Sequence, residues 1–249
     1  MKIVHFTNNT IDGAGKAVYR LHRALRSKGI DSVLAVMEKT INDDSIQRIR
    51  PRFRPVGSFV RRCMPCRVKP DTLFNVNVPA VCLSDIEQCA RNADILCLHS
   101  VQSFLSPELI GGLYKKTGIP FVWTVMDIEP LTGGCHFNGE CDGFEHECGN
   151  CPQLRRPNEN DVSRRNMRRK ARHVKGLPVT FAAGSSWVRD HIKRSSLFRN
   201  NQIKNIFLSV DDIIYKDINK PLARKSLGLP DGKKIIAFGC FNFTQTRKG

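Results

Sequence analysis

Four cysteines lie close together in the segment TGGCHFNGECDGFEHECGNCPQL, residues 132–154. Their spacing is C-x5-C-x6-C-x2-C, and they are Cys135, Cys141, Cys148 and Cys151. Four thiolates satisfy tetrahedral Zn²⁺ without an open position, which is the arrangement of a structural site. The spacing therefore predicts structural zinc, with His136 or His146 able to replace one cysteine. Buried free thiols and redox chemistry are the alternatives.

The cellular compartment bears on how all ten cysteines are interpreted. The first residues, MKIVHFTNN, contain no apolar signal region, and no apolar run approaches the roughly 20 residues of a membrane span. We therefore expect a cytoplasmic chain with reduced thiols. Cys63 and Cys66 form a CxxC without a matching pair, for which we predict no function. The cysteines in apolar runs, predicted to be core residues, are Cys82, Cys89, Cys97 and Cys240.

A glycine-containing segment, NNTIDGAGKAVYRLHRAL, follows the first predicted strand and opens the first predicted helix. Gly13 and Gly15 allow a tight turn in which backbone N–H groups at a helix N-terminus meet an anion such as a diphosphate. Val18 stands at the third position of G-x-G-x-x-G, so a dinucleotide fingerprint is not supported. The alternative is a strand–helix turn that needs glycine for its own geometry.

A histidine stands at the carboxyl end of another predicted strand. His99, in LCLHS, lies where open α/β sheets place their ligands. A structural histidine buried in the core is the alternative, and the residues alone leave both open.

Short apolar runs alternate with helical patterns along the first 208 residues. The predicted strands are Lys2–Phe6, Ser32–Met37, Asp94–Leu98, Phe121–Val125, Val179–Ala183 and Ile203–Leu208. Residues 15–28 predict an amphipathic helix with Ala17, Leu21 and Leu25 on one face. A capping box, Ser84 to Glu87, predicts a second helix, and Ser106 with Pro107 predicts the start of a third. This alternation predicts an α/β fold: a Rossmann-like parallel sheet with helices on both faces.

The formal net charge of +17 is unusual, whereas 41% hydrophobic and 25% charged residues are ordinary for a globular protein. Residues 48–69 carry eight basic side chains and no acid, and residues 155–175 carry nine against two acids. Such runs are solvated surface or contact anions, and an anionic membrane surface is the sharper prediction. Nucleic acid is disfavoured, because these runs offer only Phe53 and Phe59 for stacking on bases.

The C-terminal segment LARKSLGLPDGKKIIAFGCFNFTQTRKG predicts a helix, a turn at residues 230–232, a strand over 234–238 and a glycine-containing loop. An open sheet that ended on a lone strand would leave unpaired backbone edges. The pattern therefore predicts the beginning of a second domain, with residues 1–208 as the first domain and 209–249 as linker and start of the second.

Several segments together resemble bacterial family-4 glycosyltransferases that build surface polysaccharides. VWTVMDIEPLTGGCH, the spaced cysteines and CGNCPQL are similar to the signature W-T-x-x-D-x-x-P-x-T-G-G-C-H followed by C…C-G-x-C-P-x-L. The resemblance also runs through IDGAGKAVYRLHRAL, ADILCLHSVQSFLSPELI, AAGSSWVRDHIKRSSLF and LGLPDGKKIIAFGCFNFTQTRKG. It thus covers nearly the whole chain.

The resemblance implies a GT-B architecture, in which two Rossmann-like domains face each other across a cleft. Residues 1–208 would be the acceptor side and residues 209–249 the start of the donor-binding side. Such enzymes are retaining, use no catalytic metal and often lie peripherally on the inner membrane face. The reaction would move a sugar from a nucleotide-diphosphate sugar to a lipid-linked or glycan hydroxyl. The residues that would meet the donor phosphates are Gly13, Ala14, Gly15, Arg247 and Lys248.

Two features depart from the pattern of these enzymes. Many carry histidine just before the aspartate of W-T-x-x-D, but Met126 precedes Asp127 here, and methionine cannot act as an acid or base. Either the histidine is dispensable or another residue such as His99 serves, so Asp127 and His99 are the catalytic candidates. The acidic motif of the donor side is absent, so the chain alone is expected to be inactive. A zinc-stabilised nucleic-acid-binding module and a remnant of a disrupted gene remain as alternatives.

Overall fold

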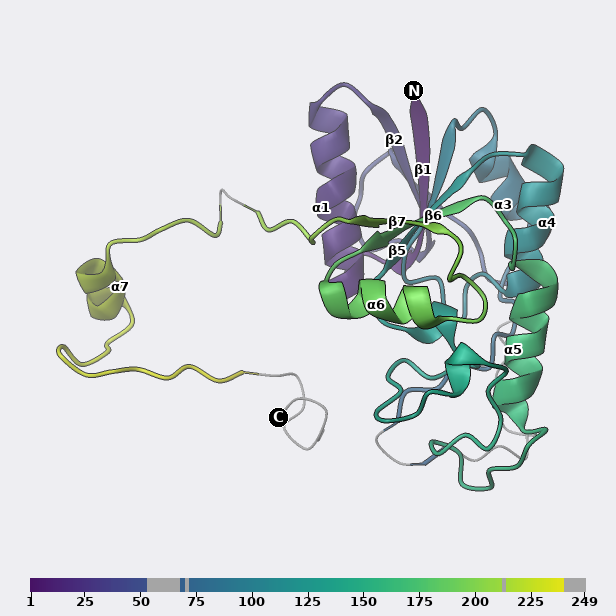
Figure 1. Cartoon of the computed structure of the whole chain (residues 1–249). Coiled ribbons are helices and arrows are strands. Elements are labelled where there is room, and N and C mark those ends of the chain that lie inside the picture. Colours follow the sequence, from purple (N-terminus) through teal and green to yellow (C-terminus); the bar gives the residue numbers. More distant parts are fainter. Residues whose placement is uncertain (53–67, 70–71, 212–213, 240–249) are drawn as a thin grey trace. The chain divides into compact units, whose positions relative to one another are not determined.

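The computed structural model describes residues 1–52, 68–69, 72–211 and 214–239 (Figure 1). The chain divides into two compact units, Met1–Ser209 and Val210–Gly249. Arg247, Lys248, the CxxC at Cys63 and Cys66, Cys240 and most of the basic run 48–69 lie outside the described residues.

The first unit is built on a seven-stranded, entirely parallel sheet with the order β3-β2-β1-β4-β5-β6-β7. The strands are β1 Lys2–Asn9, β2 Asp31–Glu38, β3 Ile46–Arg48, β4 Ile95–Leu98, β5 Phe121–Val125, β6 Val179–Ala183 and β7 Gln202–Asn205. The helices are α1 Gly13–Ser27, α3 Leu83–Ala90, α4 Pro107–Thr117, α5 Val162–His173 and α6 Ser186–Arg194. This confirms the predicted α/β, Rossmann-like fold class.

Helices cover both faces of the sheet, as the right-handed crossovers of parallel strands require. Helix α1 packs through Val18 on Leu34 and Val36, which form a small core with Ile46. Helices α3, α4 and α5 lie on the other side (Figure 1), where the main core contains Phe6, Leu98, Trp123 and Phe181. The carboxyl ends of all seven strands therefore meet at one edge of the sheet.

The predicted strand bounds match the structure best where the strand is buried. The bounds of β5 and β6 were predicted to the residue, because each is a short, mostly buried apolar run. Strand β3 was missed, since three residues at the edge of a sheet give no period. Strand β7 ends at Asn205 rather than Leu208, and residues 206–208 are exposed.

The helices confirm one predicted feature and contradict two. Ser106 caps α4 and Pro107 is its first residue, as predicted. The capping box at Ser84 is wrong: Cys82 takes the extended N-cap conformation, so Ser84 already lies inside α3 and caps nothing. In α1 the buried stripe passes through Val18 and His22, and Leu21 is 37% exposed rather than buried.

The second unit contains one helix among its described residues, α7 Lys220–Ser226, capped by Asn219. The expected turn is present at Asp231 and Gly232, where glycine has a positive φ of 71°. The strand predicted over 234–238 is not formed in the described segment, and Ile236 is 95% exposed. A strand exists only through hydrogen bonds to a neighbour, so an apolar run without one stays irregular.

No helix in the described ranges is long and apolar enough to cross a membrane.

Candidate functional site

The order of the strands reverses between β1 and β4, which is where open α/β sheets form a ligand-binding crevice. Chain connections leave these two neighbours in opposite directions along the sheet, and in such sheets ligands bind beyond the carboxyl ends at that point. Asn8 is the penultimate residue of β1, and Ser100 and Gln102 follow β4. Asp127 follows β5, the next strand along. Polar side chains from three adjacent strands therefore converge here.

Hydrogen bonds join these side chains into one row. Asn8 Nδ2 donates to the Gln102 carbonyl at 2.7 Å, and Ser100 Oγ donates to Gln102 Oε1 at 2.9 Å. Gln102 Nε2 then donates to Asp127 Oδ1 at 3.4 Å. Asn8 Oδ1 is buried and has no partner among the described residues. We call Asn8, Gln102, Asp127 and His136 the edge row.

Asp127 and His136 form the end of the edge row. Asp127 Oδ2 lies 2.9 Å from His136 Nδ1, and Oδ1 accepts the Glu129 backbone N–H at 3.0 Å. Both side chains are about one-fifth exposed, at 20% and 19%. In the neutral ring, a carboxylate facing Nδ1 places the single ring proton there, and Nε2 is then the acceptor. The pair thus resembles an oriented general base in its chemistry.

His136 is the site residue that sequence reasoning placed elsewhere. It was considered only as a substitute zinc ligand, because it directly follows Cys135. Its partner is nine positions earlier, and only the fold of the intervening loop brings the two together. The available signal was the histidine that closes T-G-G-C-H in the segment containing Asp127.

The glycine loop after β1 has less room for an anion than its sequence indicates. Asp12 caps α1, and its carboxylate accepts the Gly15 N–H at 2.6 Å. A Cβ on Gly15 would lie 2.3 Å from the Asn9 carbonyl oxygen, so close packing on β1 already requires this glycine. A Cβ on Gly13 would meet nothing within 4 Å. Gly13 and the half-buried Ala14 therefore form the accessible part of the predicted phosphate loop.

The structure places His99 in the sheet core rather than in the edge row. The ring is 2% exposed, and its Nε2 lies 3.0 Å from His5 Nδ1. Burial lowers the pKa of His99 to about 3, so the ring is neutral. Its hydrogen-bond partner is His5, not Asp127, and the two catalytic candidates are not joined by a direct bond.

His5, Cys97 and His99 form a cluster that could hold a metal, since one ligand atom of each lies within 4.8 Å of the others. His5 pairs with Cys97 across β1 and β4, and all three side chains are buried. Burial raises the pKa of the Cys97 thiol to about 12 and lowers that of His5 well below its usual value. His5 Nε2 and His99 Nδ1 have no hydrogen-bond partner in the described part of the chain. Two imidazoles and a thiol suit a soft or borderline metal ion.

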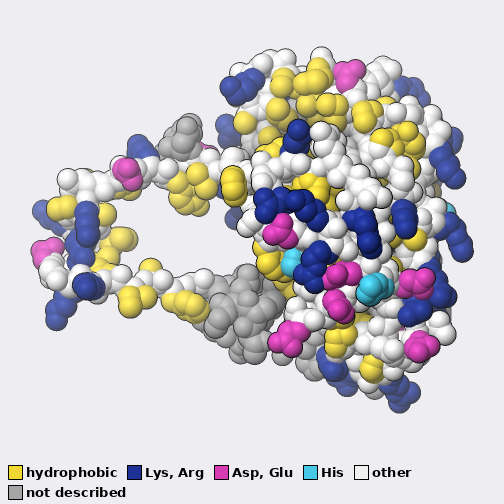
Figure 2. Space-filling view, viewed as in Figure 1, with side chains coloured by type: hydrophobic (Ala, Val, Ile, Leu, Met, Phe, Trp, Pro, Cys, Tyr) yellow, Lys and Arg dark blue, Asp and Glu magenta, His cyan; other side chains and the backbone are white. Residues whose placement is uncertain are grey.

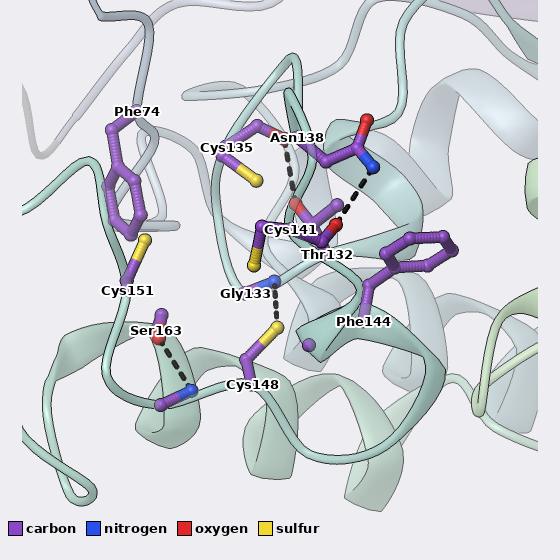
Figure 3. A pocket seen from close by; sticks show the side chains of 12 residues that line it. Phe74, Thr132, Gly133, Cys135, Asn138, Cys141, Phe144, Cys148, Cys151 and Ser163 are labelled. Carbon is purple, nitrogen blue, oxygen red and sulfur yellow. Dashed lines mark hydrogen bonds between the residues drawn. The ribbon is translucent and has the colours of Figure 1, made fainter.

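The four cysteines of residues 132–154 line one common pocket (Figure 3). The sulfurs of Cys135, Cys141 and Cys148 point into it from separate turns, and Gly133 N–H donates to Cys148 Sγ at 3.3 Å. Burial is the main cause that raises the pKa of Cys135 to about 12 and that of Cys148 to about 11, and neighbouring thiols add to it. Cys148, Gly149 and Asn150 have positive φ angles, which make the tight turn between Cys148 and Cys151.

The set of donors in this pocket fits Zn²⁺, but their spacing is wider than a closed site requires. Within the described residues, no three of these sulfurs lie within 4.8 Å of one another. Zinc at about 2.3 Å from each sulfur would draw them together. Because the segment holds one 3₁₀ turn, Gly143–Glu145, and otherwise irregular backbone, no α-helix would have to break for the sulfurs to come closer together.

Helix α5 fixes the cysteine segment to the domain. Asp161 caps α5 and also accepts the Cys151 N–H at 2.9 Å. Lys170 is 4% exposed and donates to Glu129 Oε1 at 2.8 Å and to the Thr132 carbonyl at 2.9 Å. This buried pair joins α5 to the turn between Asp127 and the first cysteine.

The basic run 155–175 is partly neutralised. Arg164 and Arg168 contact Glu147, Arg169 contacts Glu108, and Lys170 is buried. The exposed basic residues of this run are Arg155, Arg156, Arg165, Arg168, Arg172 and Lys175. Figure 2 shows Lys and Arg side chains on the visible face with acidic side chains among them.

Comparisons with known proteins support the fold. No family model matches the chain, and no curated protein matches it. Among solved structures, HepE from Anabaena, crystallised in complex with UDP, is similar with a TM-score of 0.51 and 11% sequence identity. The alignment covers 92% of this chain and 50% of HepE, so the chain spans about half the length of that protein. At this identity the likeness establishes a shared fold.

Proposed function

We propose that the chain is the acceptor-side part of a glycosyltransferase that uses a nucleotide-sugar donor. The observation that carries this proposal is the edge row at the crevice between β1 and β4, in a fold shared with a protein crystallised with UDP. The family-4 resemblance adds a GT-B architecture, of which this chain would supply the N-terminal half, and a retaining reaction.

In this proposal the chain orients the reacting groups and stabilises charge, and it forms no covalent bond to the substrate. Asp127 would face the reacting sugar, and the backbone at Gly13 and Ala14 would approach the donor diphosphate. Arg247 and Lys248, by the same resemblance, would neutralise the leaving diphosphate. Stabilising the charge that develops on the leaving group is the largest contribution such sites make. The acceptor would be a lipid-linked or polysaccharide hydroxyl.

Two further features belong to the proposal. Structural zinc would bind Cys135, Cys141, Cys148 and Cys151, whose thiols line one pocket. The exposed basic residues of 155–175 would rest on an anionic membrane surface, each adding about 1 kcal/mol. Cytoplasmic, peripheral membrane attachment would bring the site to a lipid-linked acceptor.

One set of binding measurements tests this function against its alternative. The 249-residue chain is dialysed against UDP and against uridine, and sedimented with anionic vesicles and with neutral vesicles. We expect binding of UDP in preference to uridine, and of anionic in preference to neutral vesicles. Binding of an oligonucleotide of about 20 nucleotides is measured in parallel, as the test of the alternative function. Oligonucleotide binding that falls steeply with salt, with UDP ignored, would instead support the nucleic-acid-binding module.

A further inference from the structure

We propose that the cysteine segment, residues 132–154, positions the His136 imidazole against Asp127. The segment would act as a positioning device for the edge row in addition to stabilising the fold. The ligand that the pair would receive, a sugar hydroxyl, rests on the proposed function; the positioning itself does not.

The side chain at position 126 lies away from the edge row. Met126 packs on the small core beneath α1 that contains Val18, Leu34 and Val36. Its neighbour Asp127 is directed to the crevice, where it contacts Gln102 and His136. The imidazole beside the carboxylate therefore comes from the loop and not from the adjacent residue.

Backbone contacts hold His136 on both sides. His136 N–H donates to the Leu73 carbonyl at 3.1 Å, and its own carbonyl accepts the Ile128 N–H at 3.3 Å. Thr132 Oγ1 donates to the Cys135 carbonyl at 2.7 Å and accepts the Gly134 N–H at 3.1 Å. The direction of the ring is therefore set by the conformation of residues 132–136.

The conformation of residues 132–136 depends in turn on the other cysteines. Gly133 N–H donates to Cys148 Sγ, and Cys135 enters the same pocket from the opposite side (Figure 3). A Cβ on Gly133 would lie 2.2 Å from the Ser163 carbonyl oxygen, so this segment packs closely against α5. A change at Cys148 would therefore be transmitted through Gly133 and Cys135 to His136. A metal ion bound by both Cys135 and Cys148 would hold these two residues at a fixed separation and would strengthen this coupling.

The chemistry of the pair follows from the atom that faces Asp127. With Nδ1 donating to the carboxylate, Nε2 is left to accept a hydrogen bond from a hydroxyl group. An acceptor sugar at the crevice supplies such a hydroxyl. Losing the bond to Asp127 would free the ring to rotate, and the hydroxyl would lose its oriented partner.

Ring nitrogen signals of histidine test this inference directly. The chain is labelled with ¹⁵N-histidine, which gives seven residues to observe, and His136→Gln identifies the His136 signals. Asp127→Asn gives the reference spectrum for a ring without its carboxylate partner. Spectra are then recorded for the protein as purified, after chelation, after re-addition of zinc, and for Cys148→Ser. Cys89→Ser, a half-buried cysteine of α3, is the matched control.

We expect the Nδ1 signal of His136 to move to the Asp127→Asn reference in Cys148→Ser and after chelation, and to return with zinc. The ring of His22, held by Ser32 and Ser45 far from the segment, should stay unchanged, as should His136 in Cys89→Ser. A His136 signal that is the same in the untreated protein, the chelated protein and Cys148→Ser would overturn the inference. If Cys148→Ser does not fold, the chelation and zinc spectra decide alone. No substrate is present, so failure of the proposed function would leave this result unaffected.

Discussion

Gly13 and Gly15 lie two residues apart at the start of α1, but their surroundings differ. Gly15 faces the Asn9 backbone at a distance that excludes a Cβ, whereas Gly13 faces open space. The sequence presented them as one phosphate loop. Only the packing distance separates the glycine that the fold requires from the one that is available to a ligand.

Replacing each glycine by alanine tests this distinction. We expect Gly15→Ala to lower the free energy of unfolding by about 1–3 kcal/mol, because the added methyl group meets backbone that cannot move away. Gly13→Ala should change it by less than about 0.5 kcal/mol. Urea unfolding of both variants gives the comparison. Equal losses in the two would show that α1 does not pack on β1 as described.

The candidate site was predictable only in part at this scale. Asp127 was found because it stands in a recognisable segment at the end of a strand. His136 was not, since its bond to Asp127 spans an irregular loop whose path no periodicity reports. His99 was a reasonable candidate by position, but the alternation of side chains directs its ring into the core beside His5.

Between elements, the buried Lys170–Glu129 pair joins α5 to the turn after β5. Both side chains are about 5% exposed, and Lys170 also satisfies the Thr132 carbonyl. A buried ion pair adds little over an apolar pair, but removing one partner leaves a charge without compensation. The pair therefore fixes where the cysteine segment leaves the domain.

The Lys170→Met variant should lose about 3–5 kcal/mol of unfolding free energy, because Glu129 would remain buried without its partner. Arg165→Met, on the exposed side of the same helix, is the matched control and should change stability by less than about 0.5 kcal/mol. The double variant Lys170→Met with Glu129→Leu should recover most of the loss. Thermal or urea unfolding measures all three. Similar values for Lys170→Met and Arg165→Met would contradict the buried pair.

Sequence patterns located the elements well wherever tertiary packing agrees with local preference. Strands β5 and β6 were predicted to the residue, and Ser106 with Pro107 marked the start of α4. The misplaced capping box of α3 has a local cause, since Cys82 adopts the N-cap conformation with no side-chain bond. The strand expected over 234–238 failed for a different reason: a strand needs a neighbour, which propensity alone cannot supply.

For the whole molecule, a large unit of residues 1–209 carries the sheet and the edge row. Residues 210–249 form a separate unit in which α7 has no buried residue among those described. The chain spans about half the length of HepE. Our proposal assigns this chain one side of a two-sided nucleotide-sugar site.

Mapping UDP on the ¹⁵N-labelled chain by amide chemical shifts tests the central claim most directly. We predict that UDP shifts the amides of Asn8, Gly13 and Gln102, at the carboxyl ends of β1 and β4, and that uridine shifts them less. The amides of Arg91 and Asp94, which lie beside Lys2 at the opposite, amino end of β1, should not move. Shifts confined to α5, or none at these strand ends at millimolar UDP, would contradict a nucleotide-sugar site at this crevice.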